Sequence, residues 1–408
     1  MIFLTTLIAF LTLTLPVNAR ERFFQVQSID TMKFSRDVAR EKLKDLSYDQ
    51  EIQTQVKNIA NTGATHVAIA TPYDEEFLPF LRQWVKAARE SGINVWFRGN
   101  FSGWEKWFDY PKISRDEHIV KTREFILKNP DLFEDGDIFS SCPECENGGP
   151  GDPRMKGDAE GFKRFIIAEY QAAKDSFQSI GKQVSANYYS MNGDVARLIM
   201  DEETTKGLDG IVTIDHYVST TEKLLQDIKD YAQRSGGKVV LGEFGAPIPD
   251  IHGKMSEDDQ ARWIDQAMIE LVSLPDVAGV NYWTNRGSST QLWTDNNEPL
   301  KAVEILAKYY DPINIVGSVK DEADKPLDGV EVKGEEKTTV SKNGRYALPV
   351  LAGEKVSFSK SGHEIVNVRV REEKSKDIEK DIVLKWSHPS LIYSLFIKII
   401  RFIKILFK

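Results

Sequence analysis

The sequence has few cysteines, few histidines and no excess of positive charge. Only two cysteines occur among its 408 residues, so disulfide bonds cannot be the framework of the fold. The net charge is −9 and no basic stripe occurs in the first 380 residues, which argues against a nucleic-acid partner because phosphates require a positive face. The six histidines do not supply metal ligands at zinc-finger spacing, so we predict neither a metal nor another cofactor.

The composition is that of a soluble globular protein, with 41% apolar and 28% charged residues, and the length suits two domains with appendages. At the N-terminus, an apolar run from Ile2 to Leu15 precedes the small-residue pattern VNA ending at Ala19, which a signal peptidase can cleave. Residues 1–19 are therefore predicted to be a signal peptide. An uncleaved membrane anchor is the alternative, and the body of the protein is predicted to be exported in either case.

The C-terminal segment, 387–408, contains an unusual basic and apolar pattern in residues 391–408. Its uncharged stretch lasts only seven residues, whereas a spanning helix needs about 20. We predict a helix that lies on a membrane surface, with a partner-binding or self-associating helix as the alternative. On a helix, the charges of residues 391–408 fall within an arc of about 120°, and they are Lys398, Arg401, Lys404 and Lys408.

Between residues 20 and 311, short β-like runs alternate with amphipathic helical stretches. Several runs are continuously apolar, as expected for strands that are covered on both faces. No glycine-rich phosphate loop follows the first run, which argues against an open dinucleotide-binding sheet. The pattern predicts a (β/α)8 barrel, a fold of the α/β class. The eight predicted strands are 23–29, 65–71, 93–98, 136–141, 182–187, 209–216, 238–243 and 277–283.

A different pattern follows in residues 312–386. Short period-two runs are joined by turn signals such as Asp328-Gly329 and Asn343-Gly344, which predict a small all-β sandwich. The stretch GSVKDEADKPLDGVEV, with the residues that follow it, resembles the carboxypeptidase-regulatory-like domain. This resemblance implies a non-catalytic spacer or adhesion module.

Polar, charged or aromatic residues follow nearly every predicted barrel strand, and barrel enzymes place their chemistry at the C-terminal strand ends. Glu243 ends the seventh strand in KVVLGEFGAP, and Glu144 and Glu146 follow the fourth in CPECENGG. Asp30 and Lys33 follow the first strand and are expected to line the mouth. Two carboxyl groups, one protonated and one ionised, are what cleavage of a glycosidic bond requires.

The order of a strand-four glutamate, a strand-seven G-E-F-G and a strand-eight tryptophan resembles the clan A glycoside hydrolases, which include cellulase- and mannanase-like TIM barrels. The resemblance covers roughly residues 23–310. It implies retaining hydrolysis of β-glycosidic bonds in an oligo- or polysaccharide, with Glu243 as nucleophile and Glu144 as acid/base. It further implies that His216 and Tyr217 border the nucleophile and that Trp283 floors the sugar subsite.

One residue departs from this family pattern. The acid/base of the family follows an asparagine that binds the sugar 2-hydroxyl, whereas Pro143 precedes Glu144 here. Asn187 or Asn147 is the predicted replacement, unless the substrate is held differently. The alternative function is therefore a non-catalytic sugar-binding or structural envelope protein on a glycosidase-like barrel.

Four further residues are candidates for the site, and three of them have two interpretations. Glu146 is either an alternative acid or a partner for backbone N–H groups of the following glycine-rich loop. Arg98 either holds the nucleophile ionised beside the substrate or forms an ordinary ion pair. Tyr188 is a candidate substrate contact at the end of the fifth predicted strand. Trp104 lies in NFSGWEKWFDY and either walls a sugar subsite or packs on the barrel rim.

Cys142 and Cys145 have CxxC spacing around Pro143 and Glu144. In an exported chain this spacing predicts a small disulfide ring that stiffens the loop holding Glu144, with free thiols as the alternative. No second cysteine pair is present to complete a zinc site. A metal-dependent hydrolase is disfavoured as well, because only His216 and His66 lie near predicted strands.

Overall fold

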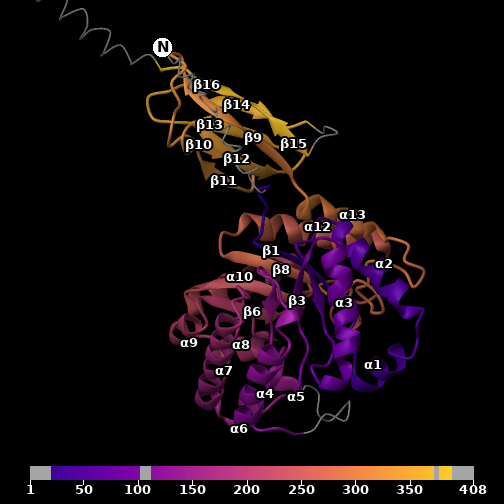
Figure 1. Cartoon of the computed structure of the whole chain (residues 1–408). Coiled ribbons are helices and arrows are strands. Elements are labelled where there is room, and N and C mark those ends of the chain that lie inside the picture. The colour runs from indigo at the N-terminus through magenta and orange to yellow at the C-terminus, as the bar shows by residue number, and fades with distance from the viewer. Residues whose placement is uncertain (1–19, 102–111, 372–375, 388–408) are drawn as a thin grey trace, which may run out of the picture.

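The computed structural model describes residues 20–101, 112–371 and 376–387 (Figure 1). The predicted signal peptide, the candidate Trp104 and the predicted amphipathic helix lie outside the described residues. Within the described part, none of the helices is both long enough and apolar enough to cross a membrane.

Eight parallel strands form the barrel, in the order β4-β3-β2-β1-β8-β7-β6-β5, and a parallel bridge between Ile138 and Ser185 closes it. The (β/α)8 architecture predicted from the sequence is therefore confirmed. The strands are β1 Val26–Asp30, β2 His66–Ile69, β3 Asn94–Phe97, β4 Ile138–Phe139, β5 Ser190–Asn192, β6 Ile211–Asp215, β7 Lys238–Phe244 and β8 Val277–Tyr282.

Amphipathic helices surround these strands. α3, for example, buries Phe80, Leu81, Trp84 and Ala88, which recur at helical spacing on one face. The α-helices are α1 Arg36–Lys42, α2 Tyr48–Asn61, α3 Leu78–Glu90, α4 Arg115–Lys128, α5 Cys145–Gly148, α6 Pro153–Lys156, α7 Ala159–Ser179, α8 Gly193–Ile199, α9 Glu202–Gly207, α10 Thr221–Ser235, α11 Pro249–His252, α12 Glu257–Ser273 and α13 Lys301–Tyr310. Two 3-10 turns cover Glu75–Phe77 and Pro130–Leu132.

The fifth strand differs from its prediction. Ser185 lies in the predicted run 182–187 and pairs with β4, because its N–H donates to Asp137 and its carbonyl accepts from Phe139. The chain then crosses to β6, where the strand β5 forms at Ser190–Asn192. The chain therefore pairs first with β4, at Ser185, and then with β6, at Ser190–Asn192. The fifth strand thus ends after Asn187, the residue at which it was predicted to end.

A separate all-β domain follows α13. Its two sheets have the orders β11-β10-β13-β14 and β12-β9-β15, and β16 also pairs with β9. Apolar side chains between the sheets form a second core that includes Ile315, Val332, Leu348 and Phe358. The strands are β9 Ile313–Asp321, β10 Glu331–Lys333, β11 Thr338–Val340, β12 Arg345–Val350, β13 Lys355–Ser359, β14 Val366–Arg369, β15 Asp377–Glu379 and β16 Ile382–Leu384.

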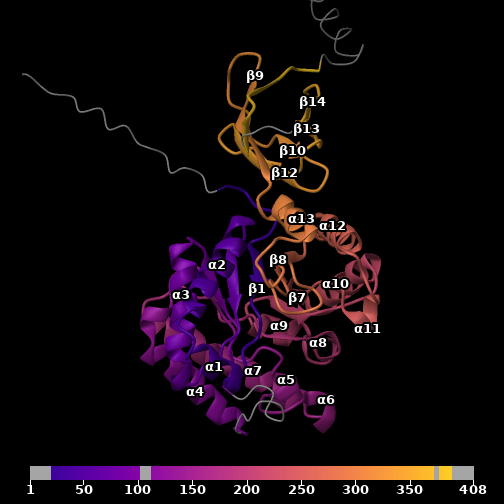
Figure 2. The same ribbon diagram turned by 90° about the vertical axis from the view of Figure 1, so that its right-hand side faces the viewer.

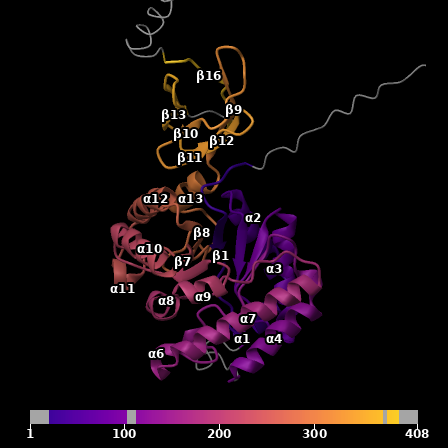
Figure 3. The same cartoon turned by 90° about the vertical axis from the view of Figure 1, so that its left-hand side faces the viewer.

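The all-β domain lies beside α12 and α13 (Figure 1, Figure 2 and Figure 3). It is at the opposite end of the barrel from α5 and α6 (Figure 1 and Figure 2). The Arg20 side chain ties the two domains together through ion pairs with Asp311 (2.5 Å) and Asp377 (3.0 Å). The C-terminal ends of the barrel strands therefore face away from the all-β domain.

Candidate active site

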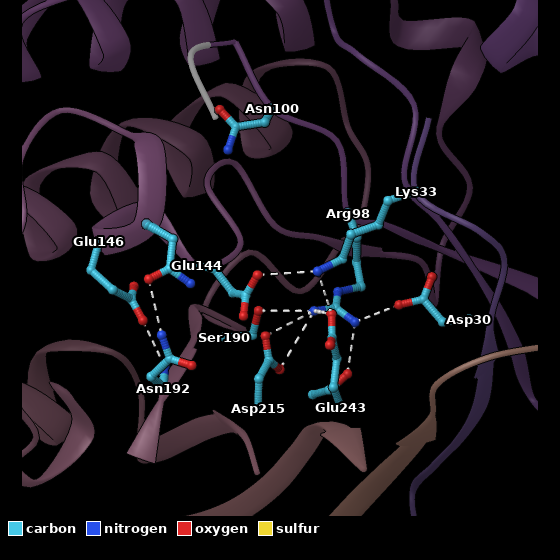
Figure 4. A network of polar contacts seen from close by, with 12 residues as sticks. Asp30, Lys33, Arg98, Asn100, Glu144, Glu146, Ser190, Asn192, Asp215 and Glu243 are labelled. Atoms are coloured by element: carbon cyan, nitrogen blue, oxygen red, sulfur yellow. Dashed lines mark hydrogen bonds and ion pairs between the residues drawn. The ribbon is translucent and has the colours of Figure 1, made fainter. Parts of the chain in front are cut away.

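Carboxyl groups from β4, β6 and β7 converge at the C-terminal end of the barrel (Figure 4). Glu243 is part of β7, Asp215 ends β6, and Glu144 follows β4 with a left-handed backbone (φ 48°). One carboxylate oxygen from each of the three residues lies within 4.8 Å of the others. The structure thus brings together the two glutamates that the sequence analysis selected.

Lys33 lies between these two glutamates. Its Nζ is 3.1 Å from Glu144 Oε2 and 2.7 Å from Glu243 Oε1. Burial alone would lower the pKa of Lys33, but the two carboxylates outweigh it and raise that pKa. The ammonium therefore stays charged, and it links the proposed nucleophile to the proposed acid/base.

Arg98 supports Glu243 from beneath. Its side chain is fully buried and its guanidinium contacts Glu243 at 3.1 Å, Asp30 at 2.5 Å and Asp215 at 3.2 Å (Figure 4). It also donates to the Gly242 carbonyl at 2.7 Å. The expectation that Arg98 contacts substrate is not met, because the side chain has no exposed surface with which to touch a sugar. Of its two sequence-based interpretations, the structure favours a cation that acts on Glu243.

Both cations affect the ionisation of Glu243. Burial would raise the pKa of this carboxyl group, but Lys33 and Arg98 outweigh burial and lower it. Burial raises the pKa of Asp30 to about 7, and burial followed by the charge of Glu243 raises the pKa of Asp215. Of Asp30, Asp215 and Glu243, it is thus Glu243 whose ionised form the protein stabilises.

Tyr217 borders Glu243, and Trp283 packs against Tyr217. The Tyr217 hydroxyl donates to Glu243 Oε2 at 2.9 Å. Its ring meets the half-buried Trp283 edge-on, with 6.3 Å between centroids. Tyr217 therefore lies beside Glu243, as the sequence analysis expected, and Trp283 lies beside Tyr217.

The His216 side chain is directed elsewhere. Its Nε2 pairs with Asp227 of α10 at 2.9 Å, while its backbone N–H donates to the Glu243 carbonyl at 2.8 Å. The ring also packs edge-on against Tyr231. His216 therefore positions the β6–β7 edge through its backbone, and the expectation of a side chain bordering the nucleophile is not met.

Asn187 and Tyr188 also lie apart from the glutamates. The Asn187 amide donates to the Leu208 carbonyl at 2.9 Å and is buried. Tyr188 packs edge-on against Trp96 in the apolar cluster inside the barrel. Their expected substrate contacts are not found because the displaced fifth strand carries both residues below the site.

Glu146 turns away from the Lys33 bridge. Its Oε1 accepts from the Asn192 N–H at 2.6 Å, and its Oε2 has no hydrogen-bond partner among the described residues (Figure 4). Burial raises the pKa of this carboxyl group to about 7. Asn147 also faces Asn192, at 3.1 Å. Glu144, and not Glu146, is therefore the strand-four glutamate that faces Glu243.

Cys142 and Cys145 form a disulfide with an S–S distance of 2.04 Å. The ring encloses Pro143 and Glu144, whose N–H donates to the Ser190 carbonyl at 2.8 Å. The loop that carries Glu144 is thus fixed at both cysteines and against β5.

Sequence reasoning missed Asp215 and the bridging position of Lys33. It expected Asp30 to line the mouth, whereas Asp30 is fully buried against Arg98. Asp215 had a signal, since it is a charged residue within the buried run GIVTIDH. Four carboxyl groups and two cations meet here: Asp30, Glu144, Asp215 and Glu243 with Lys33 and Arg98. The three carboxylates could be metal ligands by spacing alone, but the Lys33 ammonium already lies between Glu144 and Glu243.

No protein-family model matches the chain, and no curated protein matches it in sequence. Among solved structures, GH5_18 from Bifidobacterium longum subsp. longum is similar, with a TM-score of 0.53 and 15% identity over 74% of this chain and 85% of that one. A Streptomyces cattleya GH5_18 variant in complex with Manb1-4GlcNAc gives a TM-score of 0.50 and 13% identity, covering 72% and 84%. Fungal beta-1,4-galactanases give a TM-score of 0.50 and 15% identity, covering 70% and 99%. At these identities the likeness shows the fold alone, which is the (β/α)8 barrel.

Proposed function

We propose that this protein is a glycoside hydrolase that cleaves β-glycosidic bonds of an oligo- or polysaccharide with retention of configuration. The observation that carries the proposal is the approach of Glu144 and Glu243, whose carboxylate oxygens lie within 4.8 Å across the end of the barrel. Retaining enzymes place their carboxyl groups about 5–5.5 Å apart, whereas inverting enzymes leave about 6.5–9.5 Å for a water molecule. The short separation supports direct attack by one glutamate.

The surroundings of each glutamate support its role. Glu243 is buried and held ionised by Lys33 and Arg98, as a nucleophile for the anomeric carbon must be. Glu144 is more exposed and gives a proton to the leaving oxygen. The glycosyl ester on Glu243 is then hydrolysed by a water molecule, whose proton Glu144 accepts.

Lys33 fits both halves of this reaction. Before the bond breaks, Glu243 is ionised and Glu144 carries the proton, so the ammonium pairs with Glu243 at 2.7 Å. Once Glu243 is esterified it loses its charge, and Glu144, 3.1 Å from Lys33, is ionised. The ammonium therefore faces one negative carboxylate at each stage of the proposed reaction.

The binding surface for the sugar is proposed to include Trp283 and Tyr217. Trp283 is half-buried and meets the Tyr217 ring edge-on, and sugars present C–H faces that stack on such rings. The Tyr217 hydroxyl, 2.9 Å from Glu243, orients the attacking oxygen.

The test compares the wild type with Glu243→Gln and Glu144→Ala on a panel of aryl β-glycosides and of plant and bacterial glycans. We expect Glu243→Gln to lose activity on every substrate. Glu144→Ala should retain more activity on aryl glycosides with good leaving groups, because these need no protonation, and added azide should accelerate it by replacing the base-activated water. The proposal fails if Glu243→Gln turns over its substrate like the wild type.

A second candidate is a sugar-binding envelope protein without catalysis. Two observations favour it: Pro143 stands in the place of the 2-hydroxyl-binding asparagine, and Lys33 contacts both glutamates. Glycan-array binding that survives Glu243→Gln, together with no turnover of any substrate by the wild type, would support this candidate.

A further inference from the structure

A buried group of soft metal ligands lies directly behind the loop that carries Glu144. A ring nitrogen of His118 and the sulfurs of Cys142 and Cys145 all lie within 4.8 Å of one another. All three side chains are buried, and they come from α4, from the chain after β4 and from the start of α5. We propose that Cys142, Cys145 and His118 bind a zinc-type divalent cation when the cysteines are thiols.

His118 is oriented as a ligand would be. Its Nδ1 pairs with Glu169 of α7, and Thr122 donates to the same carboxylate oxygen at 2.8 Å. Its Nε2 has no hydrogen-bond partner among the described residues, although the ring is fully buried. Metal-binding histidines are held in this way, with one nitrogen on a carboxylate and the other directed at the ion.

The surrounding residues fix the ring and leave room for the sulfurs. Phe101 and Phe165 meet the His118 ring edge-on, with centroids at 5.5 Å and 5.9 Å. Gly149 approaches so closely that a Cβ there would lie 2.6 Å from Cys145 Sγ and 2.9 Å from Cys142 Sγ. Any larger residue at this position would occupy the space beside the sulfurs.

The chemistry of the donor set indicates the kind of ion. Two thiolates and one imidazole are ligands that zinc prefers, and three protein ligands leave a fourth position for water or another donor. The sequence concealed this site because His118 lies far upstream of the CxxC pair, outside zinc-finger spacing.

The disulfide and the metal exclude each other, because sulfurs bonded to one another are not thiolates. The chain is synthesised with two thiols, and binding of one divalent cation releases their two protons and forms two S–metal bonds. Starting from the disulfide, a reductant must first supply two electrons: a dithiol also gives two protons and becomes a disulfide, whereas a phosphine becomes its oxide and water supplies the oxygen and the two protons.

The consequence for Glu144 rests on the proposed function. Glu144 lies between Cys142 and Cys145, so a disulfide or a shared metal ion would each brace the acid/base loop, whereas the metal-free dithiol would not. The metal site itself can be tested without any measurement of glycoside hydrolysis, so that failure of one proposal does not decide the other.

The experiment titrates the full chain with Co²⁺ after reduction by a phosphine in metal-free, oxygen-free buffer. We expect one ion per chain with thiolate-to-cobalt charge-transfer absorption, and a higher Tm for the reduced chain with Zn²⁺. The air-oxidised wild type should show neither effect. Reduced wild type without this absorption would overturn the proposal, and so would an equal Zn²⁺ effect on Tm in the oxidised chain.

Variants then identify the ligands. His118→Gln should weaken Co²⁺ binding at least tenfold, and Glu169→Gln should weaken it by roughly 10-fold to 100-fold as an outer partner. The matched control is His363→Gln, because the His363 Nε2 also lacks a partner among the described residues but belongs to the all-β domain. Unchanged affinity in His118→Gln would overturn the assignment. If that variant does not fold, unchanged affinity in Glu169→Gln does so instead.

Discussion

At the scale of single residues, the distinctive feature of this site is the ammonium of Lys33 between two glutamates. It contacts Glu144 and Glu243 at 3.1 Å and 2.7 Å, and together with Arg98 it lowers the pKa of Glu243. The same ammonium therefore contacts both members of the proposed catalytic pair.

Lys33→Met should move the acidic limb of the kcat/KM profile to higher pH. In the wild type the lowered pKa keeps Glu243 ionised at acidic pH, so loss of one of its two cations raises that pKa, by about 1 unit or more. The check is a pH–rate profile on an aryl glycoside. Lys301→Met, which removes an exposed ion pair with Asp258, is the control and should leave the profile unchanged. An acidic limb that does not move would contradict the role of Lys33.

Glu146 should make the protein less stable as pH rises towards neutrality. Its pKa is raised from 4.5 to about 7, so the folded state binds more protons than the unfolded state between these pH values. The stabilisation is complete below pH 4.5 and is lost as pH rises through 7. At 1.36 kcal/mol per pKa unit, the free energy of unfolding falls by about 3 kcal/mol over this range.

Glu146→Gln cannot ionise and should lack this pH dependence. Urea unfolding of both proteins at several pH values gives the difference directly. Parallel curves for the wild type and the variant would contradict the raised pKa. The same variant also tests the roles of the two glutamates, since a loss of activity confined to substrates with poor leaving groups would make Glu146, rather than Glu144, the acid.

At the scale of elements, the loop between β4 and α5 depends on close packing around its sulfurs. Gly149→Ala places a Cβ 2.6 Å from Cys145 Sγ, which cannot move far because it is bonded to Cys142. We expect displacement of the Glu144 loop and a fall in kcat of about tenfold or more, since small misplacements of catalytic groups are costly.

Gly157→Ala is the matched control for this loop. Its φ is 60°, and a Cβ there would meet nothing within 4 Å, so it carries backbone strain without a clash. It should lower stability by about 1 kcal/mol and leave kcat unchanged. Equal kcat values for Gly149→Ala and the wild type would contradict the packing argument.

The fifth strand shows how far element prediction reaches. The apolar runs of β7 and β8 were identified because strands buried on both faces need no alternation. The run 182–187 is mostly polar, with apolar residues only at Val184 and Ala186, and the strand formed instead at Ser190–Asn192, where the chain meets β6. Pairing with two neighbours at different points is a property of the closed barrel, which no local pattern encodes.

At the scale of the whole molecule, the two ends of the chain carry predictions that concern location. We propose that residues 1–19 direct export and that residues 391–408 attach the protein to an anionic membrane surface. The C-terminal ends of the barrel strands face away from the all-β domain, which precedes this tail in the chain (Figure 1). An attached protein would then hold the site at a distance from the membrane.

Deletion of residues 391–408 should release the protein from membranes without changing hydrolysis of a soluble substrate. Full-length protein should sediment with vesicles that contain phosphatidylglycerol, less so in high salt, because the tail carries four basic residues. Sedimentation with purely zwitterionic vesicles is the control. Equal sedimentation of the shortened chain would contradict the assignment, and concentration-dependent self-association without vesicle binding would support the alternative.

The sequence by itself determined the barrel, the all-β domain, and Glu243 with a glutamate after the fourth strand, because periodicity and strand ends are local properties of a chain. The tertiary structure decided between Glu144 and Glu146. Only the tertiary structure decided that Lys33 joins these glutamates, that Arg98 is buried beneath them, and that Asn187 and Tyr188 lie elsewhere. It also decided that His118 meets Cys142 and Cys145. These relations join residues far apart in the chain, and their distances are set by closure of the barrel and packing of helices, which no single segment specifies.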